Sequence, residues 1–257
     1  RLNARREAVG WLKRGLQARA ITRDTAWGVK IPLDDPDVEN KRLYVWFDAP
    51  IGFITFTQQY FAGRGYAEGW KDFWQNPDCL IYHFIGKDNI PFHAITFPAM
   101  LMGVSENLAP GEQPYQLPAQ VVANEFLNFG ADKFSKSRGN LIEAEWFARK
   151  YGSEALRYYL TAVAPENNDS VFTWADFMQR YNGELADIIG NFIHRVLTFT
   201  VNKLDGKVPA PESLGSHQAF IDETQAMLSN AGALLDGLQF RNAQNMILSC
   251  ARRQRVF

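Results

Sequence analysis

The chain is poor in cysteine, with only Cys79 and Cys250 among 257 residues, and these two lie far apart. Without a C-x-x-C pair, neither a disulfide framework nor a zinc knuckle is indicated, and both cysteines are expected to be buried. No apolar run approaches about 18 residues, and no signal peptide is recognisable. These absences predict a cytoplasmic protein that does not insert into membranes.

An excess of charge is also missing, because 27 basic and 28 acidic residues leave a net charge of -1. No whole-chain basic character indicates nucleic-acid binding, so any RNA contact must come from a local patch, and no DNA partner is predicted. The 46% hydrophobic content is typical of globular proteins and suffices for one large or two modest domains.

The chain lacks an initiator methionine and opens in a segment with helical spacing, from Arg1 to Gln17. It stops at Phe257 in a basic stretch that also looks helical. We therefore expect a fragment that is cut at both ends.

The first half alternates strand-like and helix-like segments. The expected strands are Leu43–Asp48, Leu80–Ile85 and Ala119–Val122, and the expected helices are Ala49–Phe61, Trp70–Trp74 and Pro91–Met102, the last stopped by Gly103. Such alternation predicts an α/β fold with a parallel sheet, whose ligands bind at the carboxyl ends of the strands. Asp48-Ala49-Pro50, Gly86-Lys87-Asp88 and the loop around Lys136 are then expected to converge on one crevice.

The second half has a helical pattern throughout. Thr173 precedes a helix and has Asp176 three residues on, which resembles a capping box. The expected order is a helix at Glu145–Leu160, a linker at Pro165–Ser170, a long helix at Trp174–Asn202, a loop at Gly206–Ser216, and helices at Gln218–Ala231 and Gln239–Arg253.

The run K-F-S-K-S-R-G-N, from Lys133 to Asn140, carries two lysines on a loop rich in serine and glycine. A lysine ammonium on a flexible stem can neutralise the charge that develops when ATP is split. Lys136 is the candidate for the ATP phosphates, and Phe134 would anchor the loop. A solvated basic loop is an equal alternative on this segment alone.

Three further segments carry candidates, each with a structural alternative. Asp88 follows a strand and either caps the next helix or accepts hydrogen bonds from a ribose or an amino group. His93 is either a packed core residue or a crevice residue. The aromatic residues around Pro50 form either core or an apolar pocket for a polarisable thioether.

Asn191 and Arg195 are four residues apart on one helix face, and Asp187 precedes them by the same step. This pattern is either a solvated polar stripe or a surface that reads unstacked bases.

Together these segments resemble the methionyl-tRNA synthetase family of class I aminoacyl-tRNA synthetases. The motif W-F-D-A-P-I-G (Trp46 to Gly52) and the motif F-I-G-K-D-x-x-x-F-H-A (Phe84 to Ala94) carry most of the resemblance, and Lys133 to Asn140 differs at one position from the K-M-S-K-S loop. The resemblance implies a ligase that activates methionine with ATP to methionyl-adenylate and transfers it to methionine tRNA. It also implies the second half of a Rossmann-like catalytic domain followed by an all-α anticodon-binding bundle.

The resemblance also implies roles for single residues. Lys136 and Lys133 are the expected catalytic residues, and Gly86 and Asp88 join Lys136 in ATP binding. The expected methionine-binding residues are Trp46, Ala49, Pro50, Phe53 and His93, and the expected anticodon-binding residues are Asn191 and Arg195. ATP would arrive with Mg²⁺, no metal site is expected in this chain, and zinc is expected only upstream. The implied domains are 1–30 (end of a connective insertion), 31–140 (catalytic half), 141–172 (stem-contact linker) and 173–257 (truncated anticodon domain).

The chain departs from the family pattern at several positions. Phe53 stands where many members have tyrosine, Phe97 where many have tryptophan, and Asn89 where an aliphatic residue is common. No H-x-G-H motif occurs among the four histidines. Two alternatives stay open: another class I synthetase, for leucine, valine, isoleucine or cysteine, and a non-catalytic tRNA-binding paralogue.

Overall fold

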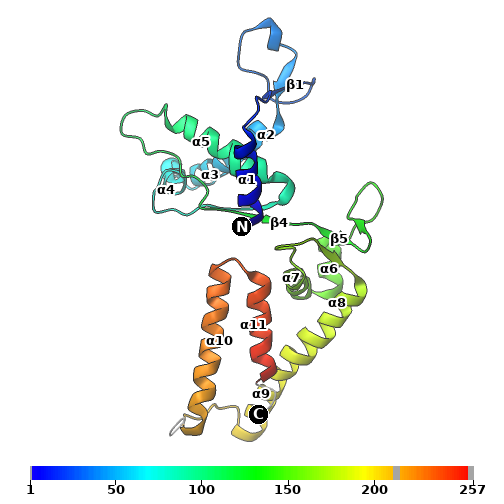
Figure 1. Ribbon diagram of the computed structural model, residues 1–257. Coiled ribbons are helices and arrows are strands. Elements are labelled where there is room, and N and C mark those ends of the chain that lie inside the picture. The colour runs from blue at the N-terminus through cyan, green and yellow to red at the C-terminus, as the bar shows by residue number, and fades with distance from the viewer. Residues whose placement is uncertain (1, 211–214, 254–257) are drawn as a thin grey trace. The chain divides into compact units, whose positions relative to one another are not determined.

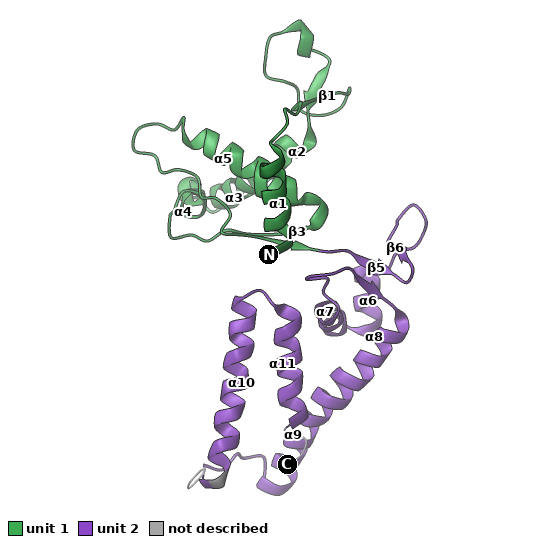
Figure 2. Ribbon diagram, in the orientation of Figure 1, with its two compact units in different colours: residues 1–124 green, residues 125–257 purple. Residues whose placement is uncertain are grey.

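The computed structural model describes residues 2–210 and 215–253, drawn as a ribbon in Figure 1. The chain folds into two compact units, Arg1–Asn124 (unit 1) and Glu125–Phe257 (unit 2), which Figure 2 colours separately. Each unit is described by itself.

Unit 1 is built on a parallel pair of strands, β3 (Tyr82–Gly86) and β4 (Gln120–Asn124), with Tyr82 opposite Gln120 and Gly86 opposite Asn124. Parallel neighbours need a crossover, because a tight hairpin can join only antiparallel strands. The crossover consists of a 3₁₀ turn η4 (Lys87–Asn89), a π-helical turn η5 (Phe92–Thr96) and helix α5 (Phe97–Ser105). Helix α1 (Leu2–Arg14) packs against β4 and η5.

The other elements of unit 1 pack on the crossover or form a separate hairpin. They are β1 (Thr22–Asp24), η1 (Pro36–Val38), β2 (Lys41–Leu43), α2 (Val45–Asp48), η2 (Ala49–Ile51), α3 (Gly52–Ala62), η3 (Ala67–Trp70) and α4 (Lys71–Trp74). Strands β1 and β2 pair antiparallel. The core between α3, α4 and α5 consists of Ile54, Trp74, Phe97 and Leu101.

Two expectations for unit 1 were wrong. The predicted strand Leu43–Asp48 is strand only at Leu43, and Val45–Asp48 is the helical turn α2. Its β-branched and aromatic residues favour a strand locally, but Trp46 stacks on Phe92 with ring centroids 4.7 Å apart, and this tertiary contact overrides the propensity. Gly103 does not stop its helix, which continues to Ser105, because an interior glycine weakens a helix by only about 1 kcal/mol.

Unit 2 begins with a small mixed sheet in the order β6-β5-β7. Strand β5 (Leu127–Phe129) pairs antiparallel with β6 (Asp132–Lys133) and parallel with β7 (Ser170–Phe172). Helices α6 (Ala144–Tyr151), α7 (Ser153–Ala162) and α8 (Trp174–Arg180) lie against it and bury an aromatic cluster. The buried members of this unit 2 core are Phe147, Ala155, Tyr159, Val163, Phe172 and Phe177.

A polar network fastens α7 to α8. The Tyr159 hydroxyl donates to Asp176 Oδ2 at 3.0 Å, and Arg180 Nε donates to the same carboxylate at 3.1 Å. Burial, and then the hydrogen bond to Asp176, raise the pKa of Tyr159 to about 12. The phenol therefore stays protonated and keeps donating at physiological pH.

The helical expectations for unit 2 were met with one exception, but the strand β7 was not predicted, because this half was expected to be helical throughout. Helix α8 continues through a π-helical segment η6 (Tyr181–Gly190) into α9 (Asn191–Leu204), and the Thr173 side chain accepts from the Asp176 N–H as predicted. The single helix predicted for Glu145–Leu160 was wrong. Gly152, with φ 91° and ψ 144°, separates α6 from α7, in a backbone region that essentially only glycine occupies.

Helices α10 (Gln218–Asp236) and α11 (Phe240–Arg253) lie side by side in unit 2 (Figure 1). A 3₁₀ turn, η7 (Gly215–His217), precedes α10. Residues 211–214 of the predicted loop and residues 254–257 of the predicted basic end lie outside the described part. The predicted anticodon bundle and the four domain boundaries stay predictions.

Candidate functional site

Six rings from five elements gather in unit 1 and are called the ring cluster. They are Trp46 of α2, Phe53 of α3, His83 of β3, Phe92 and His93 of η5, and Phe97 of α5. Three of them, Trp46, Phe53 and His93, are predicted methionine-binding residues. The structure therefore brings Trp46 and Phe53, seven residues apart, to His93, which lies 40 residues beyond Phe53 in the sequence.

His93 lies at the centre of the ring cluster. It is 4% exposed, and its Nδ1 hydrogen-bonds to Asn89 O at 3.1 Å. Its ring centroid is 6.4 Å from that of Trp46 and 5.9 Å from that of Phe53. The bond to Asn89 holds the ring in one orientation, so His93 is both packed and positioned.

Pro50 and Ala49 lead from α2 into α3. Pro50 is buried and Ala49 is exposed. Pro50 stands at the start of the 3₁₀ turn, where its fixed φ is favourable and its missing N–H costs no hydrogen bond. Just before it, Asp48 Oδ1 is buried without a hydrogen-bond partner among the described residues. This turn sets the direction of α3 and thereby the position of Phe53.

Gly86 and Asp88 lie where β3 ends. A Cβ on Gly86 would lie 2.7 Å from Asp88 Oδ1, so only glycine lets this carboxylate lie back against the strand end. Neither η4 nor the following η5 has a side-chain cap, so Asp88 does not cap the next helix in the way that the structural alternative requires. Its exposed carboxylate can accept hydrogen bonds from a ligand at the carboxyl end of a parallel strand.

The K-F-S-K-S-R-G-N segment forms a small hairpin in unit 2. Two backbone hydrogen bonds, of 2.8 and 3.0 Å, join Ser135 to Asn140, and Gly139 closes the turn with φ 69°. Phe134 packs against the unit 2 core, with its ring 5.3 Å from that of Phe129. Lys136 is left exposed at the tip.

Lys133 is placed differently from Lys136. It lies in β6, and its Nζ is 4.9 Å from the centre of the Phe126 ring. The exposed side chains of Lys133, Lys136 and Arg138 make the hairpin cationic. That donor set fits a phosphate anion and does not fit a divalent cation.

Asn191 and Arg195 lie in the first turns of α9, and both are exposed. Asp187 precedes them in η6 and is also exposed. The side chains are thus available to a ligand of unit 2. The Lys136 hairpin and the ring cluster belong to different units, so their convergence on one crevice stays a prediction.

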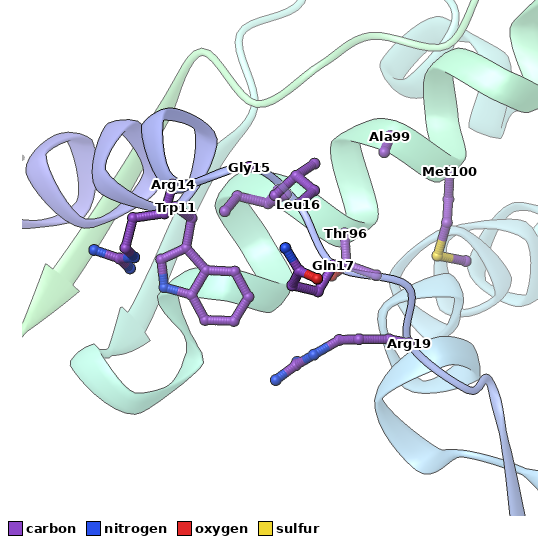
Figure 3. A pocket seen from close by; sticks show the side chains of 10 residues that line it. Trp11, Arg14, Gly15, Leu16, Gln17, Arg19, Thr96, Ala99 and Met100 are labelled. Carbon is purple, nitrogen blue, oxygen red and sulfur yellow. The ribbon is translucent and has the colours of Figure 1, made fainter.

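Two cavities of unit 1 involve arginines that the sequence analysis missed. One, of about 720 Å³, is lined by Trp11, Arg14, Leu16, Arg19 and Met100 among others, and Figure 3 shows the arginines beside the indole; it contains no predicted site residue. The other, of about 230 Å³, adjoins Trp46 and is lined also by Arg19, Arg23, Tyr44 and Phe92.

Arg23 is fixed within the smaller cavity. Its guanidinium lies 3.8 Å over the Tyr44 ring, and it donates to the carbonyls of Ala20 and Thr22 at 3.0 and 2.7 Å. A fixed guanidinium beside an aromatic wall is suited to an anionic group. Two arginines four residues apart were the only sequence signal for it.

Within residues 2–210 and 215–253, no three side chains of His, Cys, Asp or Glu are grouped to hold a metal ion. The same residues include no helix that is long and apolar enough to cross a membrane.

A family model described as "tRNA synthetases class I (M)" matches residues 1–197, more than half of the chain. The chain belongs to this family. The parallel pair β3–β4 is consistent with the class I catalytic fold.

Curated relatives of the family are named methionine--tRNA ligase. One from Pelodictyon phaeoclathratiforme is 43% identical over 249 residues, which are 96% of this chain and 35% of the relative. One from Thermococcus onnurineus is 44% identical over 97% of this chain and 34% of its own length. The chain therefore spans about a third of the length of these relatives.

A solved structure agrees with the same family. Mycobacterium tuberculosis methionyl-tRNA synthetase bound by methionyl-adenylate superposes with a TM-score of 0.78 and 26% identity, over 98% of this chain and 46% of that one. The class I catalytic fold predicted from the sequence is thereby confirmed.

Proposed function

We propose that this chain is the part of a methionine--tRNA ligase that holds the methionine side chain, contributes to ATP binding and contacts the tRNA. The observation that carries the proposal is the gathering of Trp46, Phe53 and His93 around one site, in a chain whose curated relatives carry that name. Because the chain spans about a third of those relatives, the activity belongs to the full-length gene product.

The ring cluster suits a methionine side chain. A thioether is flexible and polarisable and makes favourable contacts with aromatic edges. Trp46 and Phe53 offer such edges, buried Pro50 adds apolar surface, and Ala49 contributes only a small side chain. Shape and sulfur contacts would then select the amino acid, since one methylene in an apolar pocket is worth only about 1–3 kcal/mol.

The activation step needs no side-chain nucleophile. The methionine carboxylate attacks the α-phosphate of ATP, and the bond to pyrophosphate breaks. Asp88, with Gly86 behind it, would accept hydrogen bonds from the ribose or the amino group. Lys136 and Lys133 would stabilise the charge on the departing pyrophosphate. Mg²⁺ would enter only as the counter-ion of ATP, since the cationic hairpin offers it no ligands.

The leading test is methionine-dependent ATP–pyrophosphate exchange on the full-length gene product, with leucine, isoleucine, valine and cysteine as controls. We expect exchange with methionine alone. Exchange with one of the other amino acids would favour a different class I synthetase. No exchange with any amino acid, together with tRNA binding, would favour the non-catalytic paralogue.

Asn191 and Arg195 would read bases of the tRNA anticodon from α9. Replacing Arg195 by alanine should lower kcat/KM for aminoacylation roughly 5- to 150-fold, because a base-edge contact is worth about 1–3 kcal/mol. Methionine-dependent exchange, which needs no tRNA, should stay unchanged. The two assays on one preparation measure both effects.

Lys203→Ala is the matched control, since Lys203 is an exposed cation on the same helix. An equal loss of aminoacylation in the Lys203 variant would show a general charge effect and contradict base reading by Arg195.

A further inference from the structure

His83 is a buried histidine that the proposed mechanism does not use. It lies on β3 and is 7% exposed, and neither Nδ1 nor Nε2 has a hydrogen-bond partner among the described residues. A buried polar group without a partner costs roughly 1–3 kcal/mol, so folded proteins contain few of them. Such a group calls for an explanation in the ligand-bound state.

The neighbours of His83 indicate where its partner lies. Its ring centroid is 5.4 Å from His93, 5.7 Å from Phe53 and 5.9 Å from Phe97. His93 and Phe53 are two of the proposed methionine-binding residues. The ring of His83 therefore packs against two of the proposed methionine-binding residues.

The charge state of His83 decides what it can offer. Burial, and secondly the nearby His93, lower the pKa of His83 to about 4. Near neutral pH the ring is uncharged, with one N–H donor and one acceptor nitrogen. A neutral ring can share an apolar pocket with a thioether without the cost of burying a charge.

The Phe53 side chain cannot donate or accept a hydrogen bond, so a polar contact in the proposed pocket must come from another residue. It has no hydroxyl, so its ring supplies the pocket with aromatic surface only. The ring centroids of His83 and His93 lie 5.7 and 5.9 Å from that of Phe53, and the Nδ1 of His93 is already bonded to Asn89. His83 is a polar neighbour of Phe53 whose two ring nitrogens both lack a hydrogen-bond partner among the described residues.

We propose that His83 is a specificity residue of the methionine site, which contacts the thioether sulfur directly or through one ordered water. The inference rests on the proposed function. His83 would then favour methionine over norleucine, in which a methylene replaces the sulfur and can accept no hydrogen bond.

The test is ATP–pyrophosphate exchange by the full-length gene product with methionine and with norleucine. His83→Phe keeps an aromatic ring but removes both nitrogens. It should lower the ratio of kcat/KM for methionine over norleucine roughly 2-fold, the low end of the net value of a hydrogen bond, because a thioether sulfur is a weak acceptor. The kcat/KM for norleucine should change much less, and the melting temperature should not fall, because the variant removes unpartnered polar atoms.

Two further variants separate polarity from packing. His83→Gln keeps a donor and an acceptor and should retain more of the methionine preference than His83→Phe. Phe97→Leu disturbs the same cluster without removing a polar atom. It should therefore lower kcat/KM equally for methionine and norleucine and leave their ratio unchanged.

Each outcome decides the question. An unchanged ratio in folded His83→Phe overturns the inference, as does an equal loss in His83→Gln. If His83→Phe does not fold, His83→Leu is interpreted in the same way. A wild-type protein without methionine-dependent exchange overturns the proposed function itself, which is a different result from normal exchange with an unaltered ratio.

Discussion

Replacing Lys136 by alanine is expected to lower the methionine-dependent exchange rate of the full-length gene product roughly 10²- to 10³-fold. Lys136 is exposed at the tip of a hairpin that backbone bonds between Ser135 and Asn140 hold closed. Because the side chain is exposed, its removal should leave the fold intact, and the loss should come from the chemical step. A preorganised cation acts where charge develops on the departing pyrophosphate, and alanine removes it.

The measurement is kcat for exchange at saturating methionine and ATP, with the melting temperature recorded on the same preparation. Lys207→Ala is the matched control, because Lys207 is an exposed lysine of the same unit that lies outside the hairpin. We expect an unchanged melting temperature in both variants and a rate loss only in the Lys136 variant. A Lys136 variant within about threefold of wild type would refute the catalytic role, which calls for a far larger loss.

Much of the fold could be predicted because local signals agreed with the tertiary structure. Thr173 caps its helix as the sequence indicated, and β3 and β4 are parallel as the strand–helix alternation required. The errors arose where a contact between residues distant in sequence determined the local conformation. The stacking of Trp46 on Phe92 turns a strand-like segment into a helical turn, and no local pattern shows that partner.

Two predictions about glycines were wrong in opposite ways, and the reason is again not visible in the local sequence. Gly103 was expected to end a helix and does not, whereas Gly152 divides a helix that was expected to be continuous. What separates them is backbone conformation: only Gly152 adopts a positive φ, at 91°. Residue type alone does not reveal which glycine uses its conformational freedom.

In the candidate site too, some residues could be predicted from the sequence and others could not. Trp46, Phe53 and His93 were predicted from motifs and are brought together in unit 1. The role proposed for His83 was not predicted, because a histidine in a strand looks ordinary until its burial and its unpartnered nitrogens are known. Arg23 was missed because its partner, the Tyr44 ring, lies 21 residues further along the chain.

The second large effect concerns the core that supports the Lys136 hairpin. Phe177→Ala is expected to lower the free energy of unfolding of unit 2 by about 3–5 kcal/mol. Phe177 is 1% exposed, and its ring lies 4.8 Å from that of Phe147 and 5.4 Å from that of Tyr159. Such a loss is a large share of the roughly 5–15 kcal/mol that stabilises a typical domain.

The matched control is Phe199→Ala on α9, where the ring is 59% exposed, and which should change stability by no more than about 0.5 kcal/mol. Hydrogen exchange of the α7 and α8 amides reports unit 2 directly, and only the Phe177 variant should lose protection there. Because Phe134 packs on the same core, methionine-dependent exchange should also become more heat-sensitive in that variant. Equal amide protection in the two variants would show that the aromatic cluster does not stabilise unit 2. The Lys136 hairpin would then have to be supported by the β5–β6 pairing instead.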